Sequence, residues 1–248
     1  MSGMFAWLKS ILPRSVRRAV SLYLHRDDLT WLAAYFGTDK WGGHRYARHY
    51  VTHLGHLRTR RFNLLEIGVG GFEDPHAGAG SLRMWKAYFP HARIYGLDLF
   101  DKSSLQEDRI TIFQGSQADP AFLRALVDRI GRIDVVIDDG SHVNAHVVTS
   151  VETLFPLLPD GAIYIIEDLQ TAYWPLFGGS ADPHADNTSI AWLKARVDGL
   201  NWEEVEERAV NPLDRTIASV HLYHNLAFLY KGQNVEGSTR AQVHIVYN

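Results

Sequence analysis

The chain has 248 residues, of which 46% are hydrophobic, 21% charged and 12% aromatic, a globular composition that excludes collagenous, low-complexity and largely disordered chains. It contains no cysteine, which excludes a disulfide scaffold, a thiolate metal site and a cysteine nucleophile, and we expect a cytoplasmic protein. A net charge of −3 and a pI near 6.5 lack the basic footprint of a nucleic-acid-binding domain, so we expect no nucleic-acid partner.

Residues 1–60 are predicted to form a short helical extension with a basic, apolar beginning. The first acid is Asp27, and Lys9, Arg14, Arg17 and Arg18 are among the basic residues before it. Apolar residues lie between these basic residues, and Pro13 interrupts the segment. A signal peptide has its basic residues before its apolar stretch, whereas here the apolar residues come first. No run approaches 18 apolar residues, so we expect no transmembrane segment.

This amphipathic segment has two open interpretations. It can lie on anionic lipid, or it can pack on the domain or on a second subunit. Because Phe5, Trp7, Leu8, Ile11 and Leu12 are too apolar to be left in water, we expect a homodimer or a larger homo-oligomer.

From residue 62, short apolar runs alternate with helical stretches, which is typical of a parallel sheet with crossover helices. Buried strands are predicted at Asn63–Val69, Arg93–Leu99, Ile110–Gln114, Ile133–Ile137 and Ala162–Glu167. A terminal pair is predicted at Thr216–Leu222 and Leu226–Lys231, joined near His224 and Asn225. The fold class is therefore α/β, a doubly wound, mostly parallel seven-stranded sheet over residues 61–248.

The intervening segments predict helices and one long loop. A helix over Ser81–Phe89 would begin with Ser81 as its cap, and a helix over Pro120–Ile130 would have Asp119 as its cap. Phe177–Thr188 is interpreted as a mobile lid or a disordered connector, and a helix is expected from Ile190 to about Glu207.

The first strand ends in a glycine-rich sequence, Leu65 to Gly71. Gly68 lets a ligand approach the backbone at a strand end, where doubly wound sheets bind nucleotides. A dinucleotide fingerprint fails because Glu73 stands where the third glycine is needed. Glu66 suits a cofactor with a cationic amine and a sulfonium, since a carboxylate repels phosphate.

The second and third strands end in polar residues that suit a nucleoside. Asp98 can accept hydrogen bonds from ribose hydroxyls, and Ser116 and Gln117 follow the third strand and suit an adenine edge. Each of these residues alone is also typical of an ordinary turn.

The fourth and fifth strands end in acids. Because the two strand ends lie close together in one sheet, Asp139, Glu167 and Asp168 can converge, and an all-oxygen set favours Mg²⁺ or Mn²⁺. If Gly140 begins a helix, His142 lies beside the metal and can take a proton near neutral pH. The structural alternative for each acid is a cap of the next helix.

These residues resemble the class I S-adenosylmethionine methyltransferases, and among them the Mg²⁺-dependent sugar O-methyltransferases of macrolide biosynthesis. The resemblance spans roughly residues 35 to 180 and rests on Phe36–Lys40, Leu65–Gly71, Ser81–Lys86, Ile137–His142 and Ile166 through Trp174. It implies a metal on Asp139, Glu167 and Asp168, and His142 as the general base.

The resemblance also implies donor-binding residues. Asp138 and Glu66 would hold the methionine end of S-adenosylmethionine. Lys40 would pair with its carboxylate, and the alternative for Lys40 is an ordinary surface lysine. Asp98 would hold the ribose, Ser116 with Gln117 the adenine, and Gly68 and Ser81 complete the expected cofactor-binding set.

The substrate is less constrained. Some macrolide enzymes of this type have a large N-terminal domain, whereas about 60 residues precede the first strand here. The chain also resembles the mycobacterial 1-O-methyltransferases of methylmannose polysaccharide precursors, so the preferred acceptor is the 1-OH of a short 3-O-methylated mannoside. The alternatives are a macrolide deoxysugar, a hydroxylase-like enzyme with the same acids, a non-catalytic nucleoside- or glycan-binding protein, and a membrane-associated scaffold that acts through residues 1–26.

Overall fold

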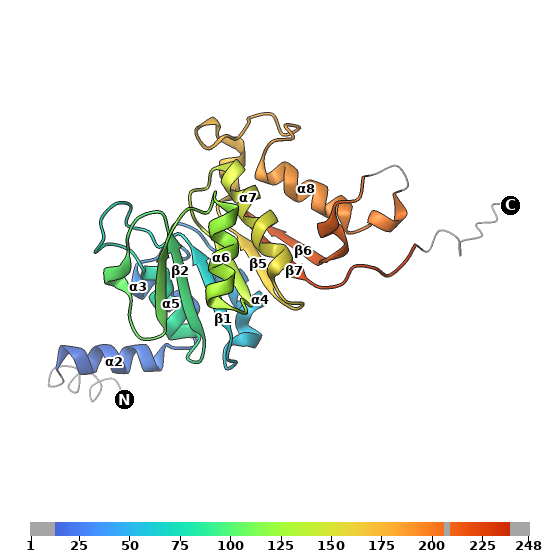
Figure 1. Ribbon diagram of the computed structural model, residues 1–248. Helices are drawn as coiled ribbons and strands as arrows, with labels where there is room; N and C mark the ends of the chain where they lie inside the picture. The colour runs from blue at the N-terminus through green and yellow to red at the C-terminus, as the bar shows by residue number, and fades with distance from the viewer. Residues whose placement is uncertain (1–12, 206–208, 239–248) are drawn as a thin grey trace.

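The protein is represented by a computed structural model that describes residues 13–205 and 209–238 (Figure 1). The strands are β1 (Asn63–Ile67), β2 (Arg93–Asp98), β3 (Ile110–Gln114), β4 (Val135–Asp138), β5 (Ile163–Ile166), β6 (Ile217–Tyr223) and β7 (Leu226–Lys231). The α-helices of the described residues are α2 (Arg14–Leu24), α3 (Leu29–Phe36), α4 (Ala47–Leu54), α5 (Gly80–Tyr88), α6 (Pro120–Ile130), α7 (Asn144–Leu154) and α8 (Ser189–Gly199). The prediction of seven strands is confirmed, with ends displaced by no more than two residues.

The strand order is β3-β2-β1-β4-β5-β7-β6. Strands β1 to β5 are parallel, and β7 enters antiparallel between β5 and β6. The order changes direction between β1 and β4, which is the switch point where open α/β sheets bind ligands. This confirms the doubly wound, mostly parallel fold class and places a binding crevice at the carboxyl ends of β1 and β4.

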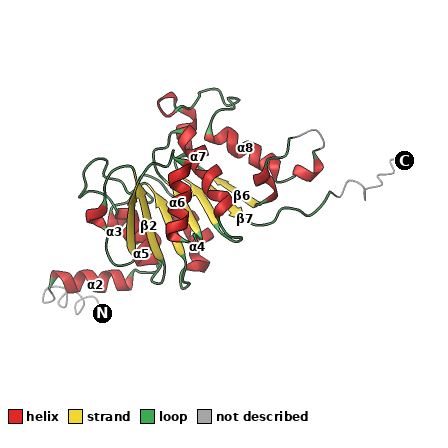
Figure 2. Ribbon diagram, in the orientation of Figure 1, coloured by secondary structure: helices red, strands yellow, loops and turns green. Residues whose placement is uncertain are grey.

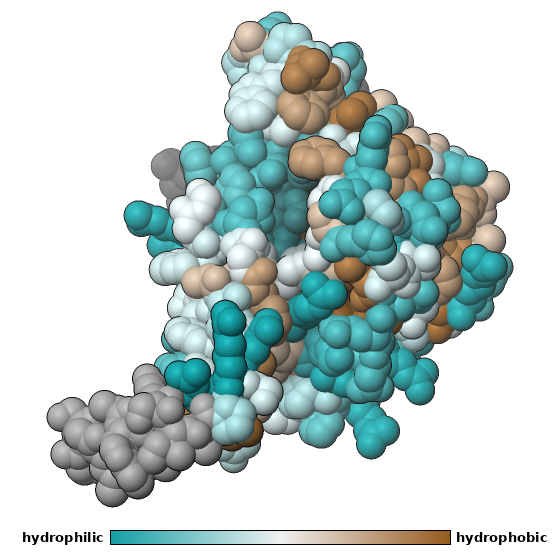
Figure 3. Space-filling model, turned by 90° about the vertical axis from the view of Figure 1, so that its left-hand side faces the viewer, coloured by the Kyte–Doolittle hydropathy of each residue, from teal (hydrophilic) through white to brown (hydrophobic). Residues whose placement is uncertain are grey.

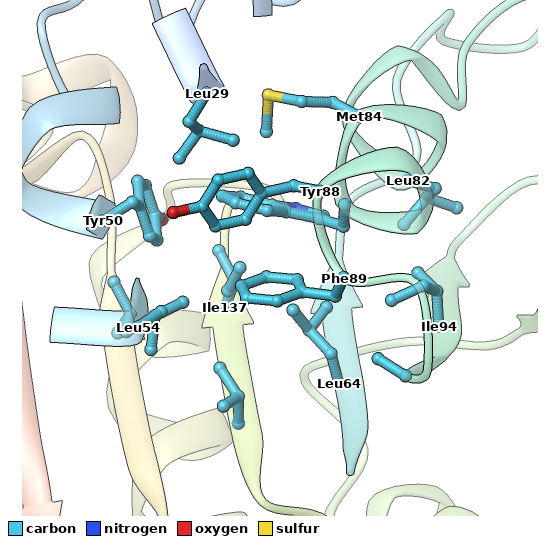
Figure 4. Packing of buried hydrophobic residues seen from close by; sticks show 14 of the residues in the cluster. Leu29, Tyr50, Leu54, Leu64, Leu82, Met84, Tyr88, Phe89, Ile94 and Ile137 are labelled. Carbon is cyan, nitrogen blue, oxygen red and sulfur yellow. The ribbon is translucent and has the colours of Figure 1, made fainter. Parts of the chain in front are cut away.

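Helices cover both faces of the sheet (Figure 2). On one face, α3, α4 and α5 pack on the sheet through a core that includes Leu29, Tyr50 and Leu82 (Figure 4). On the other face, α6, α7 and α8 form a second core with side chains such as Leu123 and Leu193. We call these the α5 face and the α7 face. Helices α3 and α4, from the predicted extension, are therefore part of the main core.

Alternation along the strands decides which face each side chain meets. In β1, Leu64 belongs to the core of the α5 face and Leu65 to that of the α7 face, which places Glu66 on the α5 face. In β5, Ile165 lies on the α5 face and Ile166 on the α7 face, so Glu167, the next residue, returns to the α5 face.

Two helix predictions need correction. Ser81 does not cap α5: the helix begins at Gly80, and Ala79 precedes it in a left-handed conformation without a side-chain cap. The last predicted helix is shorter than expected, since α8 ends at Gly199. Gly199 lies against Asp214, and a Cβ at this position would lie 2.1 Å from Asp214 Oδ1. The prediction for α6 is confirmed, with its Asp119 cap.

Helix α2 has no buried residue and extends from one end of the domain (Figure 1). Its side chains Val20, Tyr23 and Leu24 are exposed. The apolar residues Phe5 to Leu12 and Lys9, on which the oligomer and lipid predictions depend, lie outside the described residues. Among the described residues, no helix is long and apolar enough to cross a membrane.

Helix α4 contacts the β6–β7 hairpin through a buried histidine. His53 Nδ1 lies 2.7 Å from the hydroxyl of Tyr230, and its Nε2 lies 2.8 Å from the hydroxyl of Tyr223. The ring stacks on Phe228 at 4.0 Å. Burial, together with the nearby imidazole of His221, lowers the pKa of His53 to about 4, so the fold holds this side chain neutral.

Candidate functional site

The predicted site residues gather at the carboxyl edge of the parallel strands, and a single buried lysine joins three of them. Lys40, which follows α3, has no exposed surface. Its Nζ lies 2.7 Å from Glu167 Oε1, 2.8 Å from Asp139 Oδ2 and 3.1 Å from Glu66 Oε1. The partners of Lys40 in the structure are therefore carboxylates of the protein.

Tyrosine and tryptophan side chains from the α5 face complete this cluster. Tyr50 in α4 donates its hydroxyl to Glu167 Oε1, the oxygen that also accepts from Lys40. Trp85 in α5 donates its indole N–H to Glu66 Oε2 at 3.0 Å. Neither Tyr50 nor Trp85 was predicted from the sequence, because both read as ordinary core aromatics in amphipathic helices.

Burial sets the protonation of the acids. It raises the pKa of Glu66 to about 7, while the ammonium of Lys40 acts in the opposite direction. Burial and the neighbouring carboxylate of Asp139 raise the pKa of Glu167 well above its usual range. The acids outnumber the cations in this cluster, so an additional cation beside Asp139 and Glu167 would stabilise their charged forms.

The second part of the site contains Asp139, His142 and Asp168, whose ligand atoms lie within 4.8 Å of one another. His142 Nε2 is 4.0 Å from Asp139 Oδ1 and 3.7 Å from Asp168 Oδ2. The predicted metal set named Glu167 in place of His142. In the structure one oxygen of Glu167 faces Lys40 and Tyr50.

The backbone that brings His142 close to Asp139 differs from the expected helix. The condition that Gly140 begins a helix is wrong, since α7 begins at Asn144. Instead, His142 has a φ of 55°, and Asp168 has a φ of 54°. Left-handed backbone in residues other than glycine costs of order 1 kcal/mol or more and is concentrated at functional sites. The two strained residues thus face each other across the metal-binding candidate.

Asp168 has further partners from the segment before α4. The hydroxyl of Tyr46 donates to Asp168 Oδ1 at 2.8 Å, and His44 Nε2 lies 3.4 Å from the same oxygen. The rings of His44 and Tyr46 stack at 4.6 Å. Sequence reasoning missed both residues, although they follow the quoted motif Phe36–Lys40 within six positions.

Asp138 and Gln117 lie on the α7 face, away from Glu66. The amide of Gln117 donates to Asp138 Oδ1 at 3.0 Å and accepts from the backbone N–H of Ser141 at 2.7 Å. The hydroxyl of Tyr164 donates to Asp138 Oδ2 at 3.1 Å. Burial raises the pKa of Asp138 to about 6, with these hydrogen bonds acting against the shift. The structure does not bring Asp138 and Glu66 together.

The glycine-rich turn after β1 packs closely against the backbone that follows β4. Gly68 has a φ of +94°, and a Cβ there would lie 2.1 Å from the backbone oxygen of Asp139. Asp98, at the end of β2, accepts the backbone N–H of Val69 and that of Phe100, each at 2.9 Å. Ser116 follows β3 and accepts the backbone N–H of Ala118. Ser81, in α5, hydrogen-bonds Glu66.

The segment after β5 lies over the site. Residues 178–188 contain no helix or strand, and the side chain of Asn144 ties both ends of this segment. Its Nδ2 donates to the carbonyl of Phe177 at 2.9 Å, and its Oδ1 accepts the N–H of Ser189 at 2.7 Å. In Figure 3, hydrophobic residues gather at the top of the molecule, where Figure 1 places this segment, above a hollowed, mainly hydrophilic surface.

The chain has well-matched relatives of known activity, although no protein-family model matches it. It is 51% identical over 209 residues to the 8-demethyl-8-alpha-L-rhamnosyl tetracenomycin-C 2'-O-methyltransferase of Streptomyces olivaceus, which covers 83% of this chain and 55% of that relative. It is 47% identical over 217 residues to the mycinamicin VI 2''-O-methyltransferase of Micromonospora griseorubida, which covers 86% and 54%. The structure of MycE, a methyltransferase of the mycinamycin biosynthetic pathway in complex with Mg and SAH, matches with a TM-score of 0.82 and 47% identity, over 85% of this chain and 56% of that one.

The strand order and the match to MycE define a class I S-adenosylmethionine-dependent methyltransferase fold. Within that class, the chain is similar in sequence and in structure to methyltransferases that include the rhamnosyl tetracenomycin-C 2'-O-methyltransferase and MycE. It spans about half the length of the curated relatives it matches. A third relative, 37% identical over 216 residues, is the L-olivosyl-oleandolide 3-O-methyltransferase of Streptomyces antibioticus, which covers 83% of this chain and 56% of that relative. The rhamnosyl and olivosyl groups in the names of these relatives favour the macrolide deoxysugar alternative over the expected mannoside acceptor.

Proposed function

We propose that the protein is an S-adenosylmethionine-dependent O-methyltransferase that methylates a hydroxyl of a deoxysugar carried by a macrolide or related aglycone. One observation carries this proposal: Asp139, His142 and Asp168 converge within 4.8 Å at the carboxyl edge of a class I methyltransferase sheet. The names of the relatives at 47–51% identity support the acceptor class.

Asp139, Glu167 and Asp168 would hold Mg²⁺ or Mn²⁺, and the donor set fits such an ion because carboxylate oxygens are its preferred ligands. When bound, the ion would orient adjacent sugar oxygens and lower the pKa of the reacting hydroxyl. Asp168 reaches this position in a fixed orientation, because Tyr46 and His44 contact its other side.

His142 is the proposed general base. As the sugar oxygen bonds to the methyl carbon, the carbon–sulfur bond of the donor breaks, and the sulfur leaves with the bonding electron pair as a neutral thioether. The hydroxyl proton passes to Nε2 of His142, whose imidazole is the only ring nitrogen base in this group of Asp139, His142 and Asp168. The side chain retains partial solvent access, so the proton can leave to water.

The donor would occupy the crevice between β1 and β4. Gly68 keeps the backbone close, and Asp98 would accept the ribose hydroxyls with the lone pairs that Val69 and Phe100 leave free. Ser116 remains the residue proposed for the adenine edge. The amide of Gln117 already bonds Asp138 and Ser141. We therefore propose that Gln117 and Asp138, as a hydrogen-bonded pair, line the donor site beside Ser116.

The test is a panel of acceptors incubated with the donor and analysed by mass spectrometry. The panel contains macrolide and aromatic-polyketide glycosides bearing rhamnose or olivose, with free 3-O-methylated mannosides as comparators. A gain of one methyl on a deoxysugar glycoside is the expected result. Tight binding of S-adenosylhomocysteine without transfer to any glycoside would instead favour a non-catalytic nucleoside-binding protein.

Two further expectations remain proposals. A homodimer or larger assembly is proposed because helix α2 has an exposed apolar side, and a monomeric mass by light scattering would refute it. Action in the cytoplasm is proposed on the absence of cysteine, and fractionation of producing cells would test it.

A further inference from the structure

The side chain of Lys40 is a fully enclosed charge of the site. Its ammonium has three hydrogens, and three carboxylate oxygens lie within 3.1 Å of the nitrogen. These oxygens belong to Glu66, Asp139 and Glu167, which come from the ends of three different strands. Since the exposed fraction of the Lys40 side chain is 0%, this geometry leaves no open side for a ligand.

In Asp139 and in Glu167, Lys40 contacts only one of the two carboxylate oxygens. Asp139 gives Oδ2 to Lys40, while its Oδ1 is the oxygen nearest His142. Glu167 gives Oε1 to both Lys40 and Tyr50, which leaves Oε2 as the oxygen available to another cation. One oxygen of each acid is therefore fixed by the protein, and the other remains free.

We propose that Lys40 is a built-in cation of the metal site, a positioning residue that orders Asp139 and Glu167 before the divalent ion binds, rather than a ligand of the donor carboxylate. The inference rests on the proposed function, because it concerns the acids assigned to the metal there. Lys40 supplies one positive charge to an acidic group that would otherwise be ordered only by the metal.

The charge balance supports this role. Glu66, Asp139, Glu167 and Asp168 carry four potential negative charges, and Lys40 offsets one of them. Removal of one partner from a buried ion pair leaves uncompensated buried charge. Without Lys40, the stability of the fold would therefore depend more strongly on a bound divalent cation than the stability of the natural protein does.

The test compares thermal unfolding of Lys40→Met with that of the natural protein, each in chelator and in Mn²⁺. Met keeps the length of the side chain and removes its charge. In chelator we expect the melting temperature of the variant to fall by about 10 °C. We expect Mn²⁺ to raise the melting temperature of the variant by more than it raises that of the natural protein, because the ion replaces the missing cation.

Lys102→Met is the matched control. Lys102 is also buried, but its ammonium bonds the backbone carbonyls of Asp74 and Ala77 instead of acids. This variant is expected to lose stability by an amount that Mn²⁺ does not recover.

A double variant separates charge from packing. Lys40→Met combined with Glu66→Gln removes one charge of each sign, so its metal-free melting temperature is expected above that of Lys40→Met alone. If neither Mn²⁺ nor Glu66→Gln restores stability, the loss is one of packing and the proposal is overturned.

Binding of S-adenosylhomocysteine distinguishes the donor role. Calorimetry on metal-free Lys40→Met is expected to give a dissociation constant within about threefold of the natural protein. A large loss of affinity with an unchanged melting temperature in chelator would overturn the proposal and assign Lys40 to the donor carboxylate. Because these measurements need no methyl transfer, they can fail while the proposed activity is present.

Discussion

Replacement of Asn144 by Ala tests how the segment over the site is held. Asn144 is 1% exposed, and its side chain bonds the carbonyls of Thr171 and Phe177 and the N–H of Ser189. Ser189 is the first residue of α8, so its N–H has no partner within that helix. The substitution therefore removes three hydrogen bonds, two of which hold the ends of residues 178–188.

The magnitude follows from these bonds. Each contributes about 1 kcal/mol net, so we expect a loss of about 3 kcal/mol in the free energy of unfolding. For a chain of this size, that corresponds to a decrease of about 9 °C in melting temperature. The loss falls at one place, so residues 178–188 should also become more accessible in the native state.

Urea unfolding and limited thermolysin digestion measure the two effects. Asn234→Ala is the matched control, because its amide also bonds two carbonyls, those of Leu200 and Asp214, far from this segment in sequence. The control should lose stability without faster cleavage at residues 178–188. Unchanged cleavage and unfolding in Asn144→Ala would refute the role assigned to Asn144.

Three other substitutions give separate tests. Gly68→Ala should abolish binding of S-adenosylhomocysteine in calorimetry, since its Cβ would lie 2.1 Å from a backbone oxygen at a φ of +94°; normal affinity would contradict the close approach. His142→Gln should bind that ligand within about threefold and lose ~10²–10⁴-fold in turnover, whereas retained turnover would remove His142 as the base. Because the pKa of His53 is lowered to about 4, the unfolded chain binds a proton below pH ~6.5 that the folded chain does not. The contribution of His53 to the free energy of unfolding should thus fall by about 2 kcal/mol as the pH decreases from 6.5 to 4. A His53→Gln variant that shows the same pH dependence as the natural protein in urea unfolding would contradict this.

The fold could be predicted from the sequence because its strands are short apolar runs that end in polar or glycine residues. β1 to β5 each stand out in this way, and the tight turn at His224 and Asn225 marks the terminal pair. The end of α8 at Gly199 was missed, because the residues after it continue the apolar and charged pattern of the predicted helix. Likewise the start of α5 depends on the left-handed backbone of Ala79, which alanine does not signal.

The site was predicted as a set of residues at strand ends, and the structure places Asp139, His142 and Asp168 together. What the sequence could not supply was the face of the sheet on which each side chain lies. Strand alternation separates Glu66 from Asp138, although both end neighbouring strands. The partners of Lys40 and the role of Tyr50 depend on packing of helices distant in sequence, and no local pattern encodes that packing.

The most direct test of the central claim is methyl transfer by metal-depleted protein, before and after the addition of Mg²⁺. The measurement is the mass of a deoxysugar glycoside incubated with the donor and the protein. We predict that one methyl group appears on the sugar only when Mg²⁺ or Mn²⁺ is present, and that chelation abolishes the transfer. Undiminished transfer in the chelated protein would contradict the roles assigned to Asp139, Glu167 and Asp168.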